Sequence, residues 1–325
     1  MGMRATKGRP LGFEAGALVL LALMGCDSGG QAPPPPALAG EITVDEARIW
    51  YQTIGVGSPV VVVHGGPGLD HSYLVPGLEP LAEANRLILY DQRGLGSSSV
   101  PLDTTTITMT RFLDDIDALR DQVAGTERVT LLAHSWGAIP ALLYAMRWPQ
   151  RVDGIVLMSP VEPGQRYADQ TNEAQAAKRR PEDVAAMDSI AATQAFQQGV
   201  TNAVNRLFFH VFRGTFADPA VADSVFSPDF APRTARQGRI VASILMTPLA
   251  GLDFWDQLPD LAVPILIVHG TEDPIPLAMA REMASALPNA RLVEIAGAGH
   301  FPFIEQPGQT FEAIESFLRE RATTQ

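Results

Sequence analysis

The sequence has a single cysteine, Cys26, among its 325 residues. One cysteine cannot form a disulfide within the chain, so internal covalent cross-links are excluded. Basic residues are also scarce, because 24 lysines and arginines stand against 36 acidic residues, a formal net charge of −12. Phosphate backbones are bound by clustered Lys and Arg, and no basic stripe is visible. The composition therefore argues against nucleic acid as a partner.

The N-terminal segment lacks an apolar run of membrane-spanning length. Its run AGALVLLALM, at 15–24, is too short to cross a bilayer as a helix. Three basic residues precede it, which is the charged-then-apolar order of a secretory signal. The stretch LMGC, at 23–26, resembles the cleavage box of bacterial lipoproteins, although its methionine is unusual there. We expect residues 1–25 to be a signal peptide and Cys26 to be lipidated; a plain secretory signal is the alternative.

The next segment is poor in apolar residues that could build a core. Residues 26–40 read CDSGGQAPPPPALAG, which is typical of a disordered tether containing a stiff polyproline stretch. Together with the lipid anchor, this segment predicts an exported lipoprotein. We expect it to be membrane-anchored on the periplasmic or extracytoplasmic side, with no obligate protein partner.

The remaining chain alternates short apolar runs with helical patterns. A hairpin is expected around Asp45 and Glu46, and six further strands are expected from runs such as VVVV and ILIV. Continuous Val/Ile/Leu strands separated by helices predict a mostly parallel sheet covered by helices on both faces, which is the α/β class. The alternation of strands and helices is lost at 160–250, where a longer, polar and helix-prone stretch of sequence predicts an inserted helical cap. The core is then expected at 41–159 and 251–325.

Three chemically useful side chains follow predicted strands. Ser135 stands in AHSWG, between a strand and an apolar helix, in a variant of the G-x-S-x-G nucleophile elbow with Ala133 as its first residue. Asp273 and His300 each come just after a later strand. Ligands of open α/β sheets bind at the carboxyl ends of the strands, and the order Ser, Asp, His is that of an α/β-hydrolase. We predict a nucleophile, Ser135, a base, His300, and an orienting acid, Asp273.

The stretch HGGPG, at 64–68, ends an earlier strand with residues that expose the backbone. Attack by a serine on a carbonyl develops negative charge on oxygen, and backbone N–H groups must face it. We predict that the N–H groups of Gly66 and Trp136 form this oxyanion hole.

Four motifs together resemble the proline iminopeptidase branch of the α/β-hydrolase superfamily. They are HGGPG, DQRGLGSS at 91–98, HSWG at 134–137 and GAGHFPF at 297–303. The resemblance covers the core and not the cap. It implies a serine hydrolase that removes an N-terminal proline or small residue from short peptides, without a cofactor. It also implies that Asp91 and Arg93 pair and brace the loops near the site.

The cap residues do not determine the identity of the substrate. Members of that branch bind the substrate's α-ammonium with cap glutamates, one within a W-x-x-W-E-G stretch, and FHVFRG at 209–214 places Arg213 at its position. A cation there would repel an ammonium group. The acids that could act instead are Glu162, Glu173, Glu182 and Asp183.

Further residues are candidates for the substrate pocket. His134 is expected on the site wall beside Ser135. His64, which is expected mainly to brace its loop, and Arg213 are the other two pocket candidates. The phenylalanines at 208, 209, 212 and 216 could form a substrate wall or the cap's own core.

Metal and cofactor signatures are missing from the sequence. No His, Asp and Glu cluster has metal-ligand spacing, and neither glycine-rich stretch opens a helix as the dinucleotide fingerprint does. We expect no metal and no cofactor. The activity ranked first is an aminopeptidase acting on short peptides. A carboxylesterase acting on small acyl esters is the alternative, and a catalytically silent binding lipoprotein is a third.

Overall fold

A computed structural model describes residues 38–125, 128–225 and 235–322. The predicted signal peptide, Cys26 and most of the tether lie outside these residues. Within them, no helix combines the length and the apolar character needed to cross a membrane.

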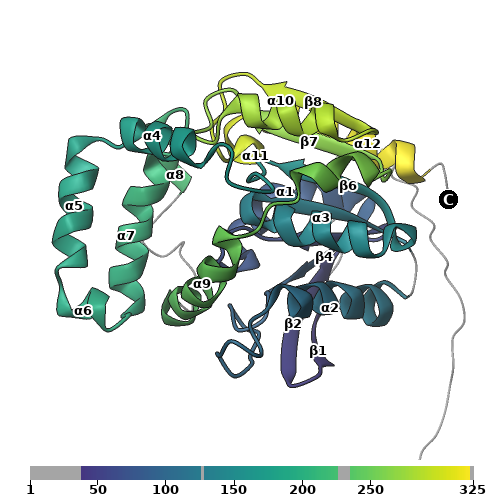
Figure 1. The fold of residues 1–325 in the computed structure, drawn as a ribbon, viewed down its shortest axis with the longest axis horizontal. Coiled ribbons are helices and arrows are strands. Elements are labelled where there is room, and N and C mark those ends of the chain that lie inside the picture. Colours follow the sequence, from purple (N-terminus) through teal and green to yellow (C-terminus); the bar gives the residue numbers. More distant parts are fainter. Residues whose placement is uncertain (1–37, 126–127, 226–234, 323–325) are drawn as a thin grey trace, which may run out of the picture. The chain divides into compact units, whose positions relative to one another are not determined.

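The centre of the fold is an eight-stranded sheet with strand order β1-β2-β4-β3-β5-β6-β7-β8 (Figure 1). The pairs β1–β2 and β2–β4 are antiparallel, and all other neighbours are parallel. The predicted hairpin is confirmed, with Asp45 in its turn at φ +51°. The strands are β1 (Leu38–Val44), β2 (Ala47–Ile54), β3 (Ser58–Val63), β4 (Asn85–Tyr90), β5 (Val129–His134), β6 (Val152–Met158), β7 (Ile265–Gly270) and β8 (Ala290–Ile295).

The valines of β3 explain why the sheet is covered on both sides. Val61 and Val63 join one buried cluster, whereas Val60 and Val62 join another, and all four are fully buried. Successive side chains of a strand point to opposite faces, so a run of valines requires two apolar layers. One layer includes α2 (Met109–Leu119), α3 (Ala138–Arg147) and α10 (Leu277–Ala286); the other includes α1 (Val75–Leu78), α11 (Pro302–Glu305) and α12 (Pro307–Ala322).

Helices α4–α9 lie between β6 and β7, and we call the insertion at residues 160–250 the cap. They are α4 (Ala168–Lys178), α5 (Pro181–Ala191), α6 (Gln194–Gln197), α7 (Thr201–Arg213), α8 (Pro219–Val225) and α9 (Ala235–Ala250). Figure 1 shows α5 and α7 side by side. The cap touches the loop after β8, because His300 donates its backbone N–H to the carbonyl of Thr215 at 2.9 Å.

Candidate active site

Ser135 occupies a strained turn between β5 and α3. Its φ is +56°, a left-handed value that is uncommon for a residue with a side chain. A tight turn follows at Ser135–Gly137, and a Cβ atom on Gly137 would lie 2.3 Å from the carbonyl oxygen of Val63. Only glycine fits this close approach of helix and strand. The turn presents the Ser135 hydroxyl beyond the carboxyl end of β5.

The structure brings Ser135, His300 and Asp273 together in one hydrogen-bonded row. Oγ of Ser135 lies 3.0 Å from Nε2 of His300, and Nδ1 of His300 lies 3.0 and 3.2 Å from the two carboxylate oxygens of Asp273. Each residue stands on the loop after a different strand, respectively β5, β8 and β7. This row has the geometry of a nucleophile, a base and an orienting acid.

Asp273 is held as an anion although it is almost fully buried. Burial by itself would raise the pKa of Asp273, but the charges of His300 and His269, with hydrogen bonds from His300 and the N–H of Ile275, lower that pKa to about 2. A carboxylate can only accept from Nδ1 of His300, so in the neutral imidazole Nδ1 carries the proton and Nε2 can accept one from Ser135.

His134 lies behind this row rather than on the pocket wall, which corrects the expectation from sequence. Its Nδ1 lies 2.8 Å from the hydroxyl of Tyr73, and its Nε2 lies 2.9 Å from the carbonyl oxygen of His300. Because a carbonyl only accepts, Nε2 carries the proton and Nδ1 accepts from Tyr73. Burial and the neighbouring charge of His300 lower the pKa of His134 to about 3, so it stays neutral.

Tyr73 extends this chain to the loop after β3. Its hydroxyl accepts the N–H of Gly65 at 2.7 Å while donating to His134. The loop that carries Gly66 and the backbone of His300 are thus joined through two buried side chains. Tyr73 was missed in the sequence, because nothing local to DHSY, at 70–73, indicates a partner 61 residues away.

Glu305 fixes the loop that carries His300 and was also missed. Its Oε1 accepts the N–H groups of Gly299 and Phe301, at 2.9 and 3.3 Å, and its Oε2 accepts the N–H of Ala217 in the cap at 2.7 Å. The signal that could have identified it is an acid in the first turn of a short helix begun by Pro302, since such acids reach back to backbone N–H groups. Burial raises the pKa of Glu305, and these three donors oppose that shift.

His64 braces its loop and does not face the pocket. Its Nδ1 donates to the carbonyl of Gly65 at 2.8 Å, its Nε2 accepts the N–H of Gln92, and burial lowers its pKa. Gln92 returns a bond to the His64 carbonyl and accepts one from the indole N–H of Trp136 at 3.1 Å. Gln92 therefore ties together the two segments predicted to supply the oxyanion hole.

Asp91 and Arg93 do not pair, so that expectation was wrong. Asp91 accepts from Nδ1 of His71 at 2.6 Å, and Arg93 forms a buried two-point contact with Asp115 at 2.8 and 2.5 Å. Both residues lie in the loop after β4, where the backbone has left the strand, and each finds a partner of its own. Asp70, His71 and Asp91 bring potential metal-ligand atoms within 4.8 Å of one another. The His71–Asp91 hydrogen bond and the contacts of Asp70 with Ser72 already explain this cluster.

A pocket of about 400 Å³ is lined by Trp136, the residue after Ser135. Both predicted oxyanion residues, Gly66 and Trp136, line it, and Gly66 has φ +138°, which only glycine adopts readily. Most other lining residues are apolar, from α3, α9, α10 and the loop after β6. Glu162 is the one acidic residue among those that line it.

The segment that carries Glu162 is hydrogen-bonded to the backbone of Ser135. The N–H of its neighbour, Val161, donates to the carbonyl of Ser135 at 3.3 Å. The Glu162 carboxylate accepts the N–H of Tyr167 at 2.9 Å, and burial raises its pKa. Of the four acids considered from sequence, Glu162 is the one that reaches the pocket.

Arg213 does not line this pocket, contrary to its expected place. It stands at the end of α7 and donates to Asp183 at 3.0 Å and to Asp223 at 2.7 Å, both in the cap. The phenylalanines of this region serve neither as a substrate wall nor only as cap core. Phe212 and Phe216 pack on Phe301, beside His300, with ring centroids 5.8 and 4.9 Å away.

A mostly parallel sheet with a serine on a strained elbow, followed by an acid and a histidine after later strands, defines a class of α/β protein. The family model described as alpha/beta hydrolase fold matches residues 58–307, which is more than half of the chain. The chain belongs to the α/β-hydrolase fold family.

Two relatives of known type match most of the chain. The chain is 28% identical over 275 residues to the proline iminopeptidase of Lactobacillus delbrueckii subsp. lactis, covering 80% of this chain and 90% of that protein. It is 27% identical over 302 residues to the proline iminopeptidase of Heyndrickxia coagulans, covering 86% and 98%.

Solved structures agree with this fold. The proline iminopeptidase-related protein of Thermus thermophilus superposes with a TM-score of 0.71 at 25% identity, covering 90% of this chain and all of that one. A thermophilic esterase from Thermogutta terrifontis gives a TM-score of 0.63 at 24% identity, with 88% and 99% covered, which shows a shared fold.

Proposed function

We propose that this protein is a serine hydrolase that cleaves amide bonds at the amino end of short peptides through an acyl-enzyme. The observation that carries the proposal is the row Ser135–His300–Asp273, with all distances at hydrogen-bond length. Relatives named proline iminopeptidase support the aminopeptidase type.

In this mechanism Ser135 attacks the carbonyl carbon and gives its proton to Nε2 of His300. The N–H groups of Gly66 and Trp136 stabilise the oxyanion. His300 then donates the proton to the leaving amine, and water hydrolyses the ester formed on Ser135 by the same steps. Asp273 keeps His300 in the required tautomer throughout.

We further propose that Glu162 binds the α-ammonium group of the substrate. In a peptide this group is attached one carbon from the scissile carbonyl, so its partner must lie in the pocket beside Ser135, and Glu162 is the acid among the residues that line that pocket. A buried cation needs an acidic partner, which the pocket otherwise lacks among its lining residues.

The test compares a prolyl arylamide that has a free amine with its N-acetylated form. We expect the free amine to have the higher kcat/KM, and Glu162→Gln to lower that preference by about 10- to 100-fold, as for loss of a charged hydrogen bond. Glu173→Gln, an exposed cap position, is the matched control. A preference for the acetylated substrate would instead favour the esterase.

The pH dependence provides a second check. Only ionised Glu162 binds an ammonium group, and burial raises the pKa of Glu162 above its ordinary value. The ratio of kcat/KM for the free and acetylated substrates should therefore fall as pH is lowered, beginning at a higher pH than an ordinary glutamate would give. The ratio cancels the titration of groups that both substrates need. A ratio independent of pH would contradict the role of Glu162.

The second candidate is a carboxylesterase that acts on small acyl esters. Its support is the largely apolar pocket and the hydrogen bond from the Tyr167 N–H, which already occupies the Glu162 carboxylate. Under this alternative, acyl esters and N-blocked substrates outperform free amines, and Glu162→Gln leaves their kcat/KM unchanged.

For location, we propose an extracytoplasmic lipoprotein anchored through Cys26. The support is the sequence pattern alone: a sole cysteine after a short apolar run and before a proline-rich tether. Cys26→Ser should release the protein from the membrane fraction or block its processing, while the catalytic domain keeps its kcat/KM. Mass spectrometry of the native protein that showed unmodified Cys26 within an intact N-terminus would contradict the proposal.

A further inference from the structure

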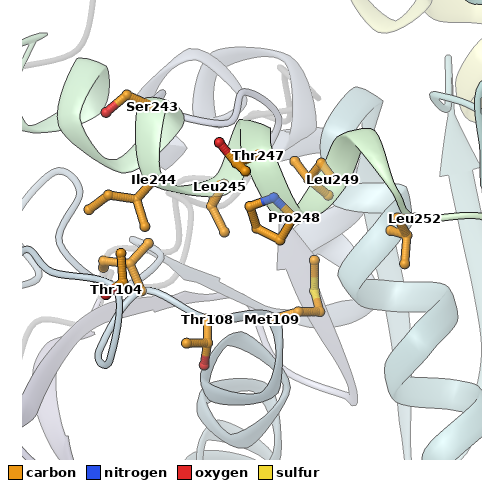
Figure 2. Close-up of a pocket in the computed structure, with 11 residues that line it drawn as sticks. Thr104, Thr108, Met109, Ser243, Ile244, Leu245, Thr247, Pro248, Leu249 and Leu252 are labelled. Atoms are coloured by element: carbon orange, nitrogen blue, oxygen red, sulfur yellow. The ribbon is translucent and has the colours of Figure 1, made fainter.

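A second cavity, of about 600 Å³, lies between α9 and the start of α2. Figure 2 shows Ile244, Leu245 and Pro248 of α9 facing Thr108 and Met109 across it. No charged residue is among those that line it, and its polar groups are hydroxyls of threonine and serine. Ligand pockets of this volume with apolar walls suit uncharged, apolar groups.

This second cavity adjoins the pocket of about 400 Å³ that Gly66 and Trp136 line, which we call the catalytic pocket. Leu249 and Leu252 belong to the walls of both cavities. Met246 lines the catalytic pocket, whereas Ile244, two residues earlier on the same helix, lines the second cavity. One helix therefore separates the two spaces, and two leucine side chains are the shared boundary.

The boundary can move at small cost. Pro248 lies inside α9 and has no N–H to donate to the preceding turn, so the helix is weakened next to Leu249. Leu249 and Leu252 are only partly buried. Because neither leucine is locked in the fully buried core, both side chains can change rotamer.

We propose that the second cavity binds an uncharged apolar chain of the substrate, which enters from the catalytic pocket past Leu249 and Leu252. This rests on the proposed hydrolase function for the identity of the catalytic pocket. The proposed substrate then carries a straight alkyl or similar apolar group in addition to the small residue that the catalytic pocket binds. Each buried methylene should tighten binding about fourfold.

The experiment measures binding without catalysis, so it does not depend on which bond is cleaved. In Ser135→Ala protein, straight-chain primary alcohols of increasing length displace an uncharged naphthylamine dye. We expect the affinity to rise about fourfold per methylene, with one alcohol bound per protein, up to a chain length that the two joined cavities hold.

Two substitutions on one helix separate the cavities. Ile244→Trp, which places a larger side chain in the second cavity, should shorten the chain length at which the gain for long alcohols ends and leave short ones unchanged. Met246→Trp, which fills the catalytic pocket, should weaken both. Thr104→Trp, on an exposed loop position that lines the second cavity, repeats the first result where Ile244→Trp fails to fold. Equal length dependence in Ile244→Trp or Thr104→Trp and the parent, or two alcohols bound independently, would overturn the proposal. Either result would leave the hydrolase assignment intact, because that rests on turnover.

Discussion

The core loops and the cap hold their polar side chains in different ways. All six residues of β5 and all six of β7 are buried, and the loops that follow them carry Ser135 and Asp273. In the cap, α4 buries none of its residues and α5 buries only Asp183 and Ile190. The core fixes its site residues through apolar packing of the preceding strand, whereas α5 and α7 of the cap are joined by ionic contacts at Asp183.

The cap's charged cluster illustrates the difference. Asp183 on α5 accepts hydrogen bonds from Arg180, His210 and Arg213 at 2.7, 2.7 and 3.0 Å. Burial would raise the pKa of Asp183, but these hydrogen bonds and charges lower it. Under the proposed function the chemistry belongs to the core, and the cap contributes Glu162 to substrate binding. Substitutions in the two regions should then change different quantities.

The largest effect is expected at the core. Ser135→Ala and His300→Ala should each lower kcat by at least about 10³-fold, leaving only binding and oxyanion stabilisation. Both should also abolish labelling by a fluorophosphonate, which reacts with an activated serine. Ser224→Ala, at an exposed cap serine, is the matched control and should label normally. Undiminished turnover in Ser135→Ala would remove the mechanism and favour the binding-protein alternative.

The core site could be predicted from sequence because each residue is covalently tied to a buried strand. Val/Ile/Leu runs fix the strands, parallel strands end at one edge, and Ser135, Asp273 and His300 follow their strands directly. The same logic locates HGGPG beside Ser135. The hairpin and the sheet were predictable for the same reason.

The contacts that support the site could not be predicted this way. Tyr73, Gln92 and Glu305 act through partners brought close only by the fold, so no local pattern specifies them. The predicted position of Arg213 was wrong for a further reason. A short ungapped match in the cap does not show which face of a helix meets the pocket. His134 was misplaced because the sequence does not show which partners a strand's last side chain meets, here Tyr73 and the backbone of His300.

A middle-sized effect is expected where core and cap meet. Glu305→Gln keeps one acceptor oxygen but turns an amide NH₂ towards a backbone N–H, either at Gly299 or at Ala217. The His300 loop should loosen, and kcat should fall about tenfold, as for loss of a hydrogen bond to a charged group. KM for small substrates should change little, because Glu305 does not line the pocket.

The control for this prediction is Glu312→Gln, an exposed position on α12. A merely structural role for Glu305 would lower the melting temperature and the yield of active protein without lowering kcat per active site. Active-site titration with a fluorophosphonate therefore distinguishes the two roles. An unchanged kcat per titrated site would show that Glu305 does not position His300.

The smallest effect on activity is expected at Arg213, inside the cap. Arg213→Glu places a third acid beside Asp183 and Asp223, and breaking this partly buried pair should favour local opening of the cap by on the order of 3 kcal/mol. Limited proteolysis should then cut within 160–250 faster than in the parent, whereas Arg213→Lys should resemble the parent. Because Arg213 does not line the pocket, the ratio of kcat/KM for free and acetylated prolyl arylamides should stay within about twofold. A strong gain in free-amine preference on Arg213→Glu would place this side chain at the substrate after all, and the division between a catalytic core and an ionically held cap would then have to be redrawn.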